Sequence, residues 1–100
     1  MLHTVNKSPF ERDSVASCLR HAAAGSAVLL IEDGIYAALR GTVFEETMRV
    51  GIGRSRVYVL GPDLAARGLG PDRLIEGIEV VDYDGFVDLV VAHDKVQAWL

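Results

Sequence analysis

The apolar run Ala27-Val28-Leu29-Leu30-Ile31 decides the class of fold, because no polar residue interrupts it. A half-exposed strand alternates apolar and polar residues, whereas an unbroken run is typical of a parallel strand covered on both faces. Asp33-Gly34 follows closely and marks a turn. We therefore expect this segment to be a central strand of a parallel sheet.

Four further segments have the composition of strands. Apolar and β-branched residues dominate most of them, and the last one alternates polar and apolar residues. Together with the central run, the predicted strands are residues 2–6, 27–31, 56–60, 78–81 and 95–100.

Helical signals fall between the predicted strands. Ser8 is a suitable N-cap, Pro9 suits the first helical position, and Glu11 completes a capping box. The helix that they predict carries apolar residues at helical spacing and ends at Gly25. Further helices are predicted at residues 35–39, with Asp33 as the N-cap, at 63–67 and at 86–93, whereas residues 42–50 suit either a helix or a strand.

The alternation of strands and helices predicts a single α/β domain over residues 1–100. We expect a mostly parallel five-stranded sheet with helices on both faces, joined by right-handed crossovers. Ligands and reactive groups of such sheets lie at the carboxyl ends of the strands. This places residues 6–8, 32–34 and 61–63 along one edge.

Composition excludes several classes of protein. Without its 3 Tyr, the hydrophobic half of the 100 residues together with the 10 Gly exceeds the usual share of about 45–50%. We therefore expect apolar surface to be buried against another chain. The net charge of -4 and the absence of a Lys/Arg cluster argue against direct binding of nucleic acid. No secretory signal or membrane span is expected, and one cysteine forms no internal disulfide, so the expected compartment is the cytoplasm.

Cys18 is the only cysteine and the main candidate for chemistry. It shares an apolar helical face with Val15, Leu19 and Ala22, where a free cysteine commonly packs as a small hydrophobe. His21 lies three residues on, close enough along a helix to favour a thiolate or to accept a proton. The residues alone leave both roles open.

Other candidate sites are weaker. Lys7 precedes a predicted helix start that attracts anions, but the loop lacks the glycines of phosphate-binding motifs. The pair Glu32-Asp33 resembles the magnesium site of receiver domains only faintly, because it follows the wrong strand. The histidines show no metal-binding spacing with each other or with Cys18, so neither a metal nor an organic cofactor is expected.

Five blocks of the sequence resemble the DsrH/TusB family of small sulfur-relay subunits, with the order and spacing of that family. They are residues 1–10 (MLHTVNKSPF), 29–39 (LLIEDGIYAAL), 57–68 (VYVLGPDLAARG), 81–90 (VDYDGFVDLV) and 96–100 (VQAWL). The cysteine in the first helix makes the chain more similar to the DsrH members than to the TusB members.

The resemblance implies a DsrE-like sandwich and an assembly. Members of the family join DsrE/TusD-like and DsrF/TusC-like subunits in a heterohexamer with two copies of each. The complex passes persulfide sulfur to a DsrC/TusE-like carrier, either in dissimilatory sulfur oxidation or in 2-thiolation of the tRNA wobble uridine. The principal acceptor cysteine belongs to the DsrE/TusD-like subunit, so the resemblance implies that Cys18 is a secondary sulfur acceptor or a structural residue.

Three hypotheses follow for the function. The chain is a sulfur-relay subunit in which Cys18 accepts sulfur, or it is a non-catalytic interaction subunit of the same complex. The third hypothesis, an independent nucleotide-binding or receiver-like module, rests only on the fold class and on the pair Glu32-Asp33.

Overall fold

Five parallel strands form one sheet in the order β4-β3-β2-β1-β5 in the computed structural model, which describes all residues 1–100. The apolar run at residue 27 forms β2, which lies in the middle of this order, as its sequence predicts. The strands are β1 (Leu2–Val5), β2 (Ala27–Leu30), β3 (Arg56–Leu60), β4 (Glu79–Val81) and β5 (Val96–Trp99).

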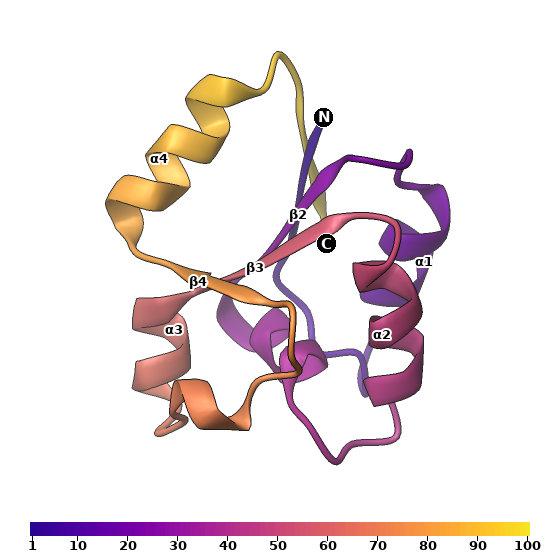
Figure 1. Cartoon of the computed structure of the whole chain (residues 1–100), viewed down its shortest axis with the longest axis vertical. Helices are drawn as coiled ribbons and strands as arrows, with labels where there is room; N and C mark the ends of the chain where they lie inside the picture. Colours follow the sequence, from indigo (N-terminus) through magenta and orange to yellow (C-terminus); the bar gives the residue numbers. More distant parts are fainter.

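Helices connect the strands and cover the two faces unequally. Figure 1 shows α4 alone on one side of the sheet, with the other helices on the opposite side. The α-helices are α1 (Ser14–His21), α2 (Glu45–Ile52), α3 (Gly61–Ala66) and α4 (Tyr83–Ala92), and the 3-10 helices are η1 (Glu32–Ala38) and η2 (Pro71–Arg73). The predicted α/β class, parallel five-stranded sheet and helices on both faces are confirmed.

Side chains of β2 feed two separate cores. Val28 and Leu30 enter a cluster of 16 buried residues beneath α1, α2, α3 and η1. Ala27 and Leu29 point to the other face, where with Leu2 they form a cluster of only 3 buried residues beneath α4. Most of the buried apolar surface, and therefore most of the hydrophobic stabilisation, lies on the first face.

The prediction that a helix starts at Ser8 is wrong. The Ser8 carbonyl accepts hydrogen bonds from Glu11 and Arg12, and its hydroxyl accepts one from Phe10, so the segment makes a single turn. The helix itself starts at Ser14, one residue before the first buried apolar position. Burial of the apolar face outweighed the local capping signal, as expected for a short helix.

Three smaller expectations also need correction. Asp33 is not an N-cap, because η1 already includes Glu32 and its N-cap is Ile31. Gly25 does not end α1, which stops at His21; its positive φ of 85° serves the turn into β2 instead. The ambiguous residues 42–50 contribute to a helix, α2.

Gly34 fixes the distance between η1 and the end of β1. A Cβ atom at Gly34 would overlap the carbonyl oxygen of Val5, which itself accepts a hydrogen bond from Ile31 at 3.0 Å. Any larger residue must push η1 away from the sheet, because the atom that it meets belongs to the backbone. This contact therefore sets the shape of the edge at the carboxyl ends of β1 and β2.

We expect Gly34→Ala to lower the free energy of unfolding by about 3 kcal/mol or more, at the upper end of overpacking effects. Gly53→Ala is the matched control: Gly53 has a helical φ of -68° and space for a Cβ, so the change should stay within about 1 kcal/mol. Urea denaturation of both variants measures the difference. Equal stability of the two variants would contradict the close approach.

Candidate functional site

Cys18 lies on the buried face of α1. Val15, Cys18 and Leu19 turn inward from this helix, and the side chain of Cys18 is 0% exposed within the large core. The apolar helical face predicted from the sequence is therefore present, and the thiol is part of it. This geometry is that of a packed cysteine.

Burial also controls the chemistry of the thiol. Removal from water raises the pKa of Cys18 to about 12, because the charged thiolate loses its solvation. At neutral pH the thiol is therefore almost entirely protonated, whereas an exposed cysteine is ionised to a few per cent. A thiol in this state is a poor nucleophile.

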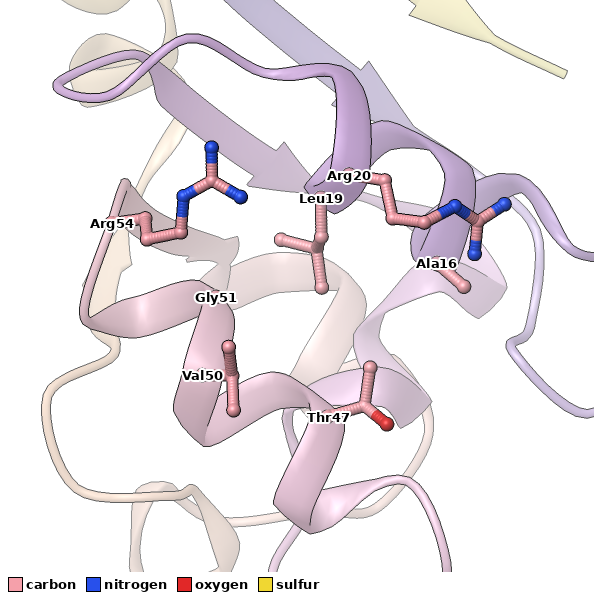
Figure 2. Close-up of a pocket in the computed structure, with 7 residues that line it drawn as sticks. All are labelled: Ala16, Leu19, Arg20, Thr47, Val50, Gly51 and Arg54. Carbon is pink, nitrogen blue, oxygen red and sulfur yellow. The ribbon is translucent and has the colours of Figure 1, made fainter.

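No surface hollow leads to the thiol. Figure 2 shows the hollow between α1 and α2, where Leu19 lies between the side chains of Arg20 and Arg54, and Val50 and Thr47 project from α2. Leu19 lines this hollow, but Cys18, the preceding residue, lines neither it nor the other three hollows. A sulfur donor of any size therefore meets no path to Cys18 in this conformation.

His21 does not activate the thiol in this arrangement. Its Nδ1 atom lies 2.8 Å from the carbonyl oxygen of Ser17, and its ring packs against Trp99 with centroids 6.0 Å apart. No hydrogen bond joins His21 to Cys18. The helical spacing predicted from the sequence is correct, but other partners hold the imidazole.

Trp99 joins the two ends of the chain through a second histidine. Its indole N–H donates a hydrogen bond of 3.1 Å to Nδ1 of His3, and the two rings have centroids 6.2 Å apart. Trp99 thus contacts both His3 and His21. Sequence reasoning missed this cluster, because only the pairing of β5 with β1 brings residues 96 positions apart together.

Burial lowers the pKa of His3 below its ordinary value, and the positive amino terminus lowers it further. A neutral imidazole also suits the hydrogen bond, since Nδ1 must carry a lone pair to accept the indole proton of Trp99. The cluster therefore holds His3 neutral. A structural role, the anchoring of β5 and α1 to β1, follows from these contacts.

The edge at the carboxyl ends of the strands assembles as predicted. The backbone N–H of Glu32 donates a hydrogen bond of 2.6 Å to the carboxylate of Asp63, across the β2–β3 boundary. Asp33 pairs with Arg67 at 2.9 Å. Both Asp carboxylates therefore make structural contacts within the edge, and the arrangement gives no support to a receiver-like site.

Two further findings concern the whole chain. No group of three or more His, Cys, Asp or Glu side chains is arranged to hold a metal ion. No helix has both the length and the apolar character that crossing a membrane requires.

Comparisons with known sequences return one family. Residues 7–96 match the family described as DsrH like protein. The chain is 40% identical over 99 residues to the protein TusB of Escherichia coli O1:K1 / APEC, which covers 99% of this chain and 100% of that protein. The TusB protein of Shigella flexneri is 39% identical with the same coverage.

Comparisons with solved structures agree on the fold. The ychN protein of E. coli superposes with a TM-score of 0.76 at 19% identity and covers 98% of this chain and 97% of its own. A protein of unknown function from Methanobacterium thermoautotrophicum, MTH1491, reaches 0.81 at 15% identity, covering 97% and 96%. At this level of identity the likeness concerns the fold alone.

We expect the native thiol to resist alkylation. At pH 7.5, iodoacetamide should modify Cys18 at least about a hundredfold more slowly than the urea-unfolded chain, because burial suppresses both ionisation and access. Mass spectrometry over time measures both rates. Equal rates in the native and unfolded protein would contradict the buried position.

We expect His3 to make the protein less stable as the pH falls below about 6.5, the ordinary pKa of histidine. Because the folded pKa of His3 is lowered, the unfolded chain takes up the proton first, and stability is lost through that range but not above it. Urea denaturation between pH 7.5 and 5.5 should show a shallower loss for His3→Gln. An unchanged pH dependence in that variant would contradict the assignment.

Proposed function

The chain belongs to the DsrH family, as its sequence blocks suggested, and from that premise we propose that it is a TusB-type subunit of a sulfur-relay complex for tRNA thiolation. The observation that carries the proposal is the identity of 40% with TusB over 99% of this chain and 100% of the relative. Its partners would be subunits of the TusC and TusD type. We place the complex in the cytoplasm, where its tRNA-modifying pathway would operate.

Within that complex we propose that the chain contributes surfaces rather than the reacting thiol. The support comes from Cys18, which is fully buried, has a pKa raised to about 12 and lines no hollow. A relay cysteine needs a thiolate and access to two partners in turn. The packing role of Cys18 therefore fits the geometry better than the role of secondary sulfur acceptor.

The chemistry of sulfur transfer also requires an accessible thiolate. In each transfer a thiolate attacks the outer sulfur of a persulfide, forms a new S–S bond and breaks the old one, and the donor cysteine leaves as a thiolate. The outer sulfur moves without net oxidation, so no cofactor is needed. We propose that the principal cysteine lies on the DsrE/TusD-like partner and that a DsrC/TusE-like carrier receives the sulfur.

A second candidate pathway is dissimilatory sulfur oxidation. The feature that favours it is Cys18 itself, since a cysteine in the first helix makes the chain more similar to DsrH members. We propose the same assembly in both cases, two copies of each of three subunits. The pathways differ in where the carrier delivers the sulfur. Loss of 2-thiouridine from the tRNA of cells that lack this chain identifies the tRNA pathway, and its retention identifies sulfur oxidation.

We expect Cys18→Ala to leave sulfur transfer within about twofold of the wild type. The variant keeps an apolar side chain in the core and removes the thiol, and it is preferable to Cys18→Ser, which buries an unpaired hydroxyl. The complex is co-purified with its neighbouring subunits, incubated with a sulfur donor and mapped for persulfides by mass spectrometry. Added sulfur should appear on a partner cysteine and not on Cys18.

The subunit composition of the purified Cys18→Ala complex is the control, because it shows whether the variant still assembles. A large loss of transfer in a Cys18→Ala complex of normal composition, with added sulfur on Cys18 in the wild type, would establish the acceptor role instead. Failure of the wild-type chain to co-purify with any TusC- or TusD-type subunit would contradict the proposed function as a whole.

A further inference from the structure

The outer face of α4 carries large apolar side chains that nothing in the chain covers. Tyr83 is 59% exposed, Val87 58%, Val90 39% and Val91 79%. Their spacing of four, three and one residues places them on one side of an α-helix. We call these four residues the α4 stripe.

The helix is apolar on nearly every side. Phe86 and Leu89 pack against the small core on the sheet, so the sheet already uses one face of α4. Asp84 and Asp88 are its only charged residues. A helix that is apolar nearly all round is normally buried all round, so α4 has the composition of a helix with a partner on each side.

The sheet beneath α4 is also incompletely covered. The core cluster on that face has only 3 buried residues, against 16 in the cluster on the other. Val96 and Ala98 of β5 pair with Leu2 and Thr4 of β1 and share their face, yet Val96 is 48% exposed. This side of the molecule therefore exposes apolar surface on both the helix and the outer strand.

Acidic residues flank the α4 stripe along the sequence, and Asp84 and Asp88 lie beside it on the helix. Between residues 79 and 94 the chain has no Lys or Arg. The acidic residues in this segment are Glu79, Asp82, Asp84, Asp88 and Asp94. The segment therefore combines an apolar stripe with an acidic rim along α4. Positive groups, Lys95 and the amino terminus of Met1, lie with Asp94 past the end of the helix.

We propose that the α4 stripe binds a protein subunit different from this chain, whose apolar contact surface is bordered by Lys and Arg. The inference rests on the proposed function and adds the interface to it. A second copy of this chain fits poorly, because a symmetric contact through α4 would bring two acidic rims together. Phosphate-rich partners, RNA or an anionic membrane, are repelled by the same charge.

Val87→Lys tests the apolar centre, and Val43→Lys is the matched control. Val43 is 93% exposed and precedes α2, on the opposite side of the sheet from α4, so both variants add one lysine at an exposed valine. We expect Val87→Lys to weaken binding to the TusC- or TusD-type subunit about tenfold or more, because it puts a charge into the interface centre beside a basic rim. Val43→Lys should bind as the wild type does.

Asp84→Asn combined with Asp88→Asn tests the rim. Asp82 is left unchanged because its carboxylate caps α4 by accepting a hydrogen bond from Gly85 at 2.8 Å. We expect the double variant to bind more weakly and to lose part of the salt dependence of binding, since two attractive contacts are removed. Unchanged or tighter binding would contradict the proposal that Lys and Arg border the contact surface of the partner.

The outcomes separate this inference from the proposed function. If the wild type binds a subunit and Val87→Lys binds equally well, the α4 interface is wrong while the proposed function stands. If neither the wild type nor Val43→Lys binds any such subunit, the proposed function fails and this inference fails with it. If sedimentation shows a dimer of the isolated chain that Val87→Lys dissociates, the occupant is a second copy and the inference is overturned.

Discussion

Burial of β2 on both faces is the constraint on which the rest of the structure depends. Its four residues, Ala27 to Leu30, are all buried and send alternate side chains to opposite sides of the sheet. Such a strand is stable only if each face is covered. The chain covers one face with three α-helices and η1, and the other with α4 alone. The unequal coverage links the fold to the proposed assembly, because α4 and β5 on the less covered face expose several apolar side chains.

The well-covered face determines what Cys18 can do. The first helix crosses this face, so its inward positions must be apolar and tightly packed. A thiol at such a position stabilises the core and is neutral at physiological pH, because burial raises its pKa to about 12. Sulfur transfer needs the opposite environment, an ionised and accessible thiol. The same side chain cannot meet both demands in one conformation, and in this structure Cys18 meets the first.

The sequence predicted the features that depend on long-range burial patterns better than those that depend on local signals. The central strand, the parallel order and the carboxyl-end edge follow from an unbroken apolar run and from strand–helix alternation. The helix start at Ser8 was wrong because a good capping pattern preceded a segment with no apolar face to bury. The contact of Trp99 with His3 and His21 could not be predicted from the sequence, because β1 and β5 come from opposite ends of the chain. At the candidate site, spacing predicted the buried face of α1, but only the packed structure fixed the ionisation of the thiol.

In the relay complex that we propose, not every subunit needs a reacting thiol. A subunit without one would supply a face that holds the reactive cysteine of a neighbour in place and admits the carrier. The single thiol of this chain, Cys18, is poorly suited to attack a persulfide, because it is buried and its pKa is raised. The proposed role of the chain is that of a binding partner, because α4 exposes apolar side chains beside the carboxylates of Asp84 and Asp88. Apolar burial gives such a contact its strength and the charged border restricts which subunit can form it. The high apolar content of the sequence and the small core beneath α4 then have one physical explanation, the burial of α4 against another chain that we propose.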